Sequence, residues 1–216
     1  IAPIGKPTST FILKKNDNKC MPYESKNFEY LTGLSGFSDQ LLKDHFTLYQ
    51  GYVANFNKLD QTLMAIEKAG NFGTPEFAEM NRRLGWEFNG MRLHELYFGN
   101  LTKAFRAIDA GASLYAAIAK EFGSYELWEK DFRLMGAMRG IGWVVLYHDA
   151  IAGRLFNVWV NEHDVGHMAG AIPLLVMDVF EHAYIRDYGI VRKDYIEKFM
   201  ASIEWAAVEG RYSQIS

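Results

Sequence analysis

An aspartate and a histidine stand four residues apart in the segment 178–192, which reads DVFEHAYIRDYGIVR. The apolar run 173–177 before it predicts a short buried strand, and the segment itself opens a helical pattern that continues toward Trp205. Asp178 would therefore end the strand, and His182 would lie one helical turn later. At such a corner the carboxylate and the imidazole can face one space and bind a single metal ion. The pair alone does not decide between a metal site and a hydrogen-bonded core histidine.

Two more histidines lie in long helical patterns. Apolar residues recur at helical spacing over residues 41–68, and again over about 75–101 after the strong helix start Thr-Pro-Glu. His45 lies in the first pattern and His94 in the second, each on an otherwise apolar face. Singly, each is more simply explained as a hydrogen-bonded residue inside a helical domain. Jointly with the Asp-His pair, they would form a site of three histidines and one carboxylate that leaves a position open for solvent or substrate.

The remaining patterns predict an α+β fold. Residues 1–37, with three prolines and a polar run, are predicted to form an irregular N-terminal arm that wraps the first helices. The two long helices predict an antiparallel helical hairpin domain over 38–103, with Ser38 as the first cap. A C-terminal α/β domain over 104–216 would carry a small antiparallel sheet of about three strands. Its predicted elements are helices over 104–122 and 125–138, strands over 143–147, 154–160 and 173–177, and a helical C-terminus over 181–210.

Composition and charge exclude several classes of protein. Hydrophobic residues make up 49% and aromatic residues 15% of the chain, which excludes a disordered protein. The net charge is -3 and there is no basic block, so we expect neither nucleic acid nor an anionic membrane as a partner. No apolar run approaches the roughly 18 residues of a membrane span. The lone Cys20 fits a reducing compartment, so a cytoplasmic location is favoured, and export stays open because the chain begins with Ile1 rather than Met.

Several short motifs follow one another in a specific order. The most specific are DVFEHAY at 178–184, then Tyr188, Arg192 and DYIEKF at 194–199. Supporting motifs are YVANFNKL at 52–59, HELYF at 94–98, AIAKEFGSYE at 117–126, GIGWVVL at 140–146 and IEWAAVEGRY at 203–212. This order resembles the iron/manganese superoxide dismutases over about residues 22–212. The resemblance implies an enzyme that converts superoxide to dioxygen and hydrogen peroxide. It also implies one iron or manganese ion per subunit, with four ligands: His45, His94, Asp178 and His182.

The resemblance also assigns residues around the metal. Tyr52 matches a tyrosine that guards the substrate channel, and Trp143 matches an aromatic wall. His163 matches a side chain hydrogen-bonded to the metal-bound solvent, with Gly90 leaving room for it to reach the site. The spacing from His45 to Tyr52 is seven residues, where the family usually has eight. Seven residues advance about 700°, so we predict that both side chains share one face of a regular α-helix without a π-bulge.

The implied interface includes two departures from the family. Glu181 matches a residue that bonds to the ligand His182 of the opposite subunit, which implies a homodimer or a tetramer built from it. Tyr49 stands where the family usually has a histidine, and Ile185 where it usually has a tyrosine. Because those two groups continue a hydrogen-bond chain in the family, their replacement bears on proton supply. The residues assigned to the surrounding shell and interface also include Tyr184 and Arg192.

The sequence leaves alternatives for the chemistry. Iron is the preferred metal and manganese the other, because the two ions favour similar ligands. The alternative function is a superoxide dismutase-like metal-binding protein with low or no dismutase activity, which the two departures motivate. A mononuclear iron oxygenase is disfavoured, since such enzymes typically use two histidines and one carboxylate. We expect surface roles for His148, near a hairpin turn, and for His167, in the loop before the third strand.

Overall fold

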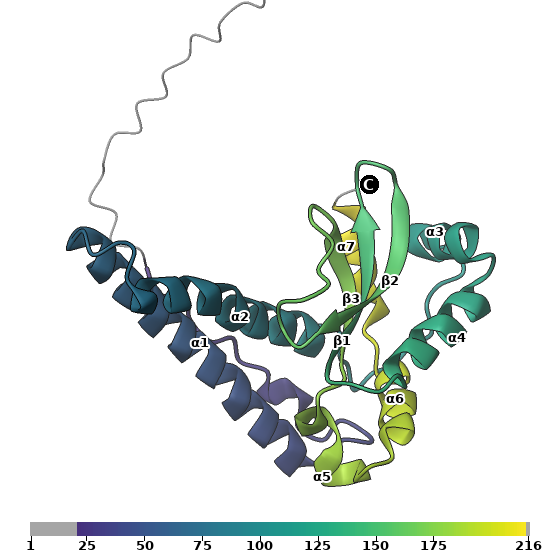
Figure 1. Cartoon of the computed structure of the whole chain (residues 1–216). Helices are drawn as coiled ribbons and strands as arrows, with labels where there is room; N and C mark the ends of the chain where they lie inside the picture. Colours follow the sequence, from purple (N-terminus) through teal and green to yellow (C-terminus); the bar gives the residue numbers. More distant parts are fainter. Residues whose placement is uncertain (1–20, 215–216) are drawn as a thin grey trace, which may run out of the picture.

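The computed structural model of the protein describes residues 21–214. Its two longest helices, α1 (Asp39–Lys68) and α2 (Pro75–Phe98), lie side by side as an antiparallel pair (Figure 1). The side-chain oxygens of Ser38 and Thr74 each accept a hydrogen bond from the N–H group three residues on. These caps satisfy N–H groups that have no partner within the helix, so the helices begin where the sequence predicted.

Helix α1 is α-helical along its whole length, without a π-turn. The predicted loss of the bulge between His45 and Tyr52 is therefore confirmed. Because the two residues are separated by nearly two full turns, both side chains project from the same face of α1. That face is directed toward α2 and the sheet.

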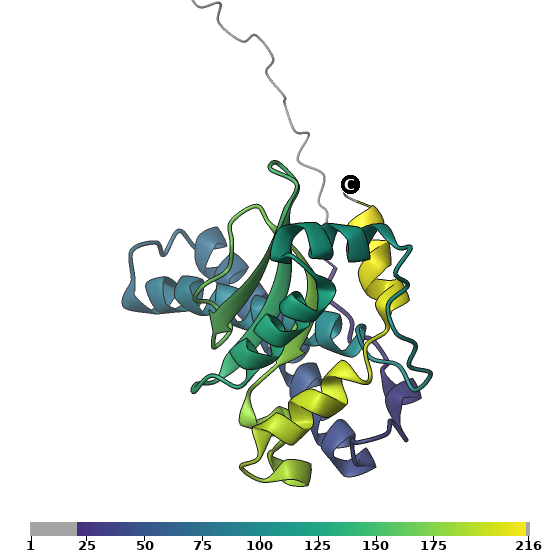
Figure 2. The same cartoon turned by 90° about the vertical axis from the view of Figure 1, so that its right-hand side faces the viewer.

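A three-stranded antiparallel sheet forms the other half of the core. Strand β1 (Gly142–Asp149) lies between β2 (Arg154–Asn161) and β3 (Ile172–Asp178). Helices α3 (Ser113–Phe122) and α4 (Tyr125–Gly136) lie over one face of the sheet (Figure 2). The central strand is buried on both faces, which accounts for its nearly continuous apolar sequence. The predicted α+β class is confirmed.

The C-terminus predicted as helical over 181–210 is helical but interrupted. The chain forms η2 (Glu181–Ala183), α5 (Ile185–Tyr188), α6 (Arg192–Met200) and α7 (Trp205–Ser213). Gly189, with a φ of 54°, turns the chain after α5. Between α6 and α7, the N–H of Glu204 donates to the carbonyl of Asn100 at 2.6 Å. This long-range bond takes the place of a helical one, and a periodicity argument does not detect it.

Residues 104–112, predicted as helix, form a loop. The N–H of Gly111 donates to the side-chain oxygen of Asp109 at 2.9 Å, and this local turn competes with a helix until α3 begins. Helix α2 also ends at Phe98 rather than near residue 101, and α4 ends at Gly136 rather than 138.

The described part of the N-terminal arm, residues 21–37, packs on the helical pair. Its apolar side chains Phe28, Leu31, Leu34 and Phe37 are buried. Its main chain is tied to α1, because the N–H of Lys26 donates to the hydroxyl of Tyr49 at 2.9 Å. Residues 1–20 of the predicted arm, including Cys20, lie outside the described residues. Within residues 21–214, no helix combines the length and hydrophobicity that crossing a membrane requires.

Candidate metal centre

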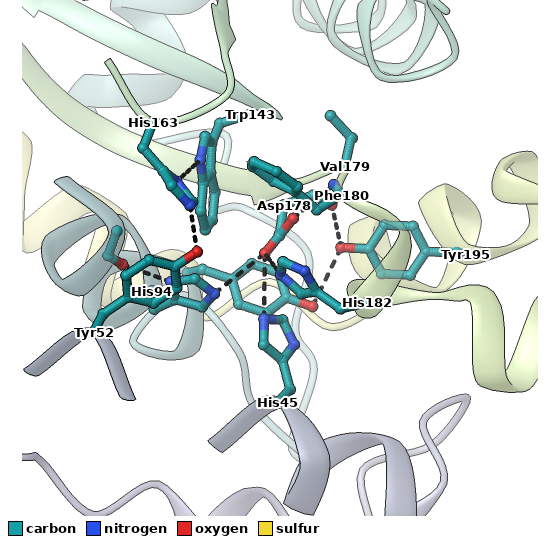
Figure 3. A network of polar contacts seen from close by, with 12 residues as sticks. His45, Tyr52, His94, Trp143, His163, Asp178, Val179, Phe180, His182 and Tyr195 are labelled. Carbon is teal, nitrogen blue, oxygen red and sulfur yellow. Dashed lines mark hydrogen bonds and ion pairs between the residues drawn. The ribbon is translucent and has the colours of Figure 1, made fainter. Parts of the chain in front are cut away.

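Four side chains from four elements converge between the helical pair and the sheet (Figure 3). His45 comes from α1, His94 from α2, Asp178 from the end of β3 and His182 from η2. One possible ligand atom of each lies within 4.8 Å of the others. The Oδ2 atom of Asp178 is 3.2 Å from Nε2 of His45, 3.6 Å from that of His94 and 3.1 Å from that of His182. The structure thus brings together the four residues that the sequence analysis named.

The corner after β3 sets the direction of the Asp178 carboxylate. Its Oδ1 atom accepts the N–H of Phe180 at 2.8 Å, and its main-chain carbonyl accepts the hydroxyl of Tyr195 at 2.6 Å. With Oδ1 engaged, Oδ2 faces the three imidazoles. The chain then enters the 3-10 turn η2, not the α-helix predicted here, and this turn delivers His182 to the same point.

Burial and hydrogen bonding determine the charges of these groups. Burial lowers the pKa of His45 and lowers that of His94 well below the usual value, so both imidazoles are neutral at pH 7. Burial also opposes ionisation of Asp178, but the attraction and the hydrogen bond of His182, together with the nearby ring of His45, outweigh it and hold the pKa of Asp178 far below its usual range. The centre therefore combines an ionised carboxylate with the neutral imidazoles of His45 and His94.

The tautomer of His94 leaves one nitrogen free to bind. Its Nδ1 lies 2.5 Å from the carbonyl oxygen of Gly90. A carbonyl oxygen only accepts, so Nδ1 carries the proton and Nε2 presents a lone pair toward the centre. Within the described residues, Nε2 of His45 and Nε2 of His94 are buried without a hydrogen-bond partner. Leaving such an atom unpaired costs about 1–3 kcal/mol, so these nitrogens, beside a carboxylate oxygen, fit a bound metal ion.

A second chain of hydrogen bonds lies next to the four residues (Figure 3). The indole N–H of Trp143 donates to Nδ1 of His163 at 3.1 Å. Burial lowers the pKa of His163 to about 4, so the ring is neutral and its only proton is on Nε2. That Nε2–H group donates to the hydroxyl oxygen of Tyr52 at 2.7 Å. The hydroxyl proton of Tyr52 is consequently left to bond elsewhere.

Comparison with known proteins identifies the family. A family model described as the C-terminal domain of iron/manganese superoxide dismutases matches residues 110–211. A manganese superoxide dismutase (number 2) of Haloferax volcanii is 35% identical over 195 residues, which cover 90% of this chain and 94% of the relative. The chain belongs to the iron/manganese superoxide dismutases. An iron superoxide dismutase of Aquifex pyrophilus is 32% identical to this dismutase, covering 84% of this chain and 86% of the relative. An iron superoxide dismutase of Cupriavidus metallidurans is 34% identical, covering 83% of this chain and 90% of the relative.

These relatives and the His/Asp centre agree on function. The protein is a superoxide dismutase, an oxidoreductase that uses iron or manganese, and superoxide is its substrate. Relatives named for each metal match at similar identity, so the comparisons do not separate the two metals.

The role expected for Gly90 in the dismutase needs a correction. A Cβ atom at this position would lie 2.5 Å from Cδ1 of the Tyr52 ring. The space that the glycine leaves is therefore filled by the ring of Tyr52, and the hydroxyl of that ring is hydrogen-bonded to His163. Tyr52 in turn stacks on the ring of His94, with 5.2 Å between centroids.

Two further aromatic residues lie beside His163. The ring of Trp86 meets that of His163 edge-on at 4.9 Å, and the ring of Phe180 stacks on it at 4.8 Å. Trp86 precedes Gly90 by four residues in α2, so the two share a helix face, and this spacing could have indicated it. Phe180 lies in the irregular corner after β3, where no periodicity applies.

The residues assigned to the surrounding shell occupy several environments. Tyr49 is buried, and its hydroxyl donates to Glu95 at 3.1 Å; burial raises the pKa of Tyr49 to about 12. Tyr184 stacks on Tyr195 at 5.7 Å. Arg192 donates to the main-chain carbonyls of Gly140, Val179 and Met138 and so fixes the corner after β3. Glu181 and Ile185 are exposed beside His182.

The expected surface roles of His148 and His167 are wrong. Strand β1 extends to Asp149, so His148 lies within the strand and is buried. His167 is half-buried: it donates to the main-chain carbonyl of His163 at 2.9 Å and meets the hydroxyl of Tyr147 at 2.7 Å. His148 was placed at the turn because β1 is longer than its apolar run, and the contacts of His167 with Tyr147 and His163 are not visible in the sequence.

Proposed function

We propose that His45, His94, Asp178 and His182 hold one metal ion per subunit at which superoxide is dismutated. The observation that carries the proposal is the convergence of three imidazole Nε2 atoms on Oδ2 of Asp178. When bound, the metal supplies the one-electron oxidation and reduction that dismutation requires, a chemistry that zinc, calcium and magnesium do not offer. The protein holds the ligands in place with groups from four elements. It also keeps the carboxylate of Asp178 ionised although that side chain is buried.

We also propose that Tyr52 and His163 supply protons and order the substrate. Peroxide forms from superoxide by gain of one electron and two protons, so a proton donor must stand near the metal. His163 donates its single N–H to Tyr52, which directs the Tyr52 hydroxyl proton away from His163. Burial raises the pKa of Tyr52 to about 12, so the hydroxyl keeps its proton at neutral pH. Trp143 fixes the tautomer on which this direction depends.

Tyr52 also faces the solvent side of the centre. It lines a surface depression of about 500 Å³ together with Leu48, Arg83 and Glu87, among others. Superoxide entering from this depression meets the Tyr52 hydroxyl before it meets the ligands. Tyr52 is therefore proposed to be the last group that orients the substrate.

Iron is our prediction for the metal, and a homodimer is our prediction for the assembly. The donor set accepts iron and manganese alike, so geometry and metal supply select between them. The dimer is supported by the exposure of the residues around the metal ligand His182. The side chain of His182 is 28% exposed, and Glu181 and Ile185 lie beside it on the surface. Glu181 of a second copy could accept the N–H of His182 that faces away from Asp178.

Elemental analysis and a superoxide-decay assay on one purified sample test the function. We expect one iron or manganese ion per chain and rapid superoxide decay that is lost in His94→Ala. Bound metal without decay would favour the alternative of a dismutase-like metal-binding protein, with Tyr49 and Ile185 as the suspected cause. Failure to take up metal after reconstitution would exclude the four-ligand site.

A further inference from the structure

The turn that carries His163 is unusually constrained. Strand β2 ends at Asn161, and Asn161 pairs with Val165 in an isolated bridge across the turn. Within this turn, Glu162 has a φ of 51°, in the left-handed region that residues other than glycine rarely adopt. His163 itself is fully buried. A strained backbone persists only where its surroundings hold it, so the main chain of His163 needs an anchor.

His167 supplies a bond to that main chain. Its Nε2 lies 2.9 Å from the carbonyl oxygen of His163, and since a carbonyl only accepts, Nε2 carries the proton. With the proton on Nε2, Nδ1 presents a lone pair, and the hydroxyl of Tyr147 donates to it at 2.7 Å. Tyr147 is buried in β1, so the anchor ends in the strand that is paired on both sides.

Strand β1 therefore holds His163 at two points. Trp143 and Tyr147 are four residues apart, so they project from the same face of the strand. Trp143 binds the imidazole of His163 directly, and Tyr147 holds its main chain through His167. We propose that His167 is a positioning residue that fixes His163 against Tyr52, an inference that rests on the proposed role of His163.

The geometry explains why a second anchor matters. The Nδ1 atom of His163 is taken by Trp143, which leaves one N–H group for Tyr52. A hydrogen bond weakens steeply as its distance and angle depart from the optimum. Any shift of the turn therefore weakens the bond by which His163 directs the Tyr52 hydroxyl.

The indole N–H of Trp143 provides a spectroscopic test. We would load the full chain with zinc, which is diamagnetic, and record the nitrogen-proton spectrum, with Trp143→Phe to assign the signal. His167→Ala is expected to shift this signal toward that of an indole without a partner. His167→Gln is expected to restore it, because the amide can donate to the carbonyl and accept from Tyr147. An unchanged signal in His167→Ala would overturn the proposal.

Kinetics give the second readout. In metal-loaded protein we expect His167→Ala to lower the superoxide-decay rate per bound metal by about 10-fold, the usual effect of losing an outer partner. Tyr147→Phe should add nothing to His167→Ala, since both act through one chain. The control is His148→Gln, a buried histidine of β1 next to Tyr147, which should change neither the rate per metal nor the indole signal.

His163→Ala separates this inference from the proposed function. If His163→Ala is as fast as the unmodified protein, the role of His163 fails, and the inference fails with it. If His163→Ala is slow while His167→Ala keeps its rate and its indole signal, only the positioning role of His167 is overturned.

Discussion

At the scale of single residues, the centre is organised by which nitrogen of each histidine carries the proton. His94 gives its Nδ1–H to Gly90 and turns a lone pair toward Asp178, whereas His163 accepts at Nδ1 from Trp143 and donates from Nε2. The sequence supplies the histidines but not these tautomers. Each tautomer depends on a contact made only in the folded chain, such as the one between residues 143 and 163.

Gly90→Ala tests how closely Tyr52 is packed. The new Cβ would overlap the Tyr52 ring, so we expect a loss of about 1–3 kcal/mol in the free energy of unfolding. We also expect a slower superoxide decay with unchanged metal content, because Tyr52 and not a ligand is displaced. Gly85→Ala in the same helix is the control: nothing lies within 4 Å of its Cβ, and it should stabilise the protein by about 0.5–1 kcal/mol. Equal behaviour of the two variants in thermal unfolding would contradict the packing argument.

At the scale of elements, the sequence predicted the helices and strands that are determined by neighbouring residues in the chain. Helices α1 and α2 follow from Ser38 and Thr74 as caps and from a long apolar period, and the strands follow from their β-rich runs. The loop at 104–112 and the breaks after Tyr188 and Met200 were missed. The loop depends on a side-chain turn at Asp109, the break after Tyr188 on the positive φ of Gly189, and the break after Met200 on a bond from Glu204 to the distant Asn100. Helical periodicity carries no information about any of the three. The four converging residues were named from spacing and resemblance, but the contact of His167 with His163 was not.

The corner after β3 is an element fixed largely by one side chain. Arg192 donates to three main-chain carbonyls there, including that of Val179, which follows Asp178. Arg192→Ala leaves these carbonyls without that donor, so we expect the free energy of unfolding to fall by about 1–3 kcal/mol. Because Asp178 is then less well oriented, metal affinity should also fall by roughly 10-fold. Chemical denaturation and metal titration measure the two effects.

The neighbour of Arg192 provides the matched control. Lys193→Ala removes an exposed cation of the same helix and should change neither quantity appreciably. If Arg192→Ala lowered stability while metal affinity stayed constant, the corner would not control the orientation of Asp178.

At the scale of the whole molecule, the centre joins elements that are distant in the sequence. Its four residues come from α1, α2, β3 and η2, so a bound ion links the helical pair to the sheet. With free metal at 1,000 times its dissociation constant, binding would stabilise the fold by about 4 kcal/mol. For a chain of this length, that corresponds to a rise in melting temperature of roughly 8–16 °C.

Metal removal should therefore lower the melting temperature by that amount in calorimetry. Zinc is expected to restore much of the stability without restoring superoxide decay, since it accepts these ligands but does not change oxidation state. An equal melting temperature with and without metal would mean that the four residues do not bind one ion together.

The exposed surface around His182 predicts that the protein is a homodimer. We expect light scattering to give a mass of twice 24.7 kDa, with Glu181 of one copy accepting a hydrogen bond from His182 of the other. Glu181→Ala should weaken the dimer by at least about 10-fold, since a hydrogen bond to a charged group contributes roughly 1.5–3 kcal/mol and symmetry repeats it. Glu79→Ala, which removes the same charge from an exposed ion pair of α2, should leave the dimer intact. Because His182 is also a proposed ligand, Glu181→Ala should lower metal affinity in parallel with dimer affinity; a fully metallated, fully active monomer would exclude this coupling.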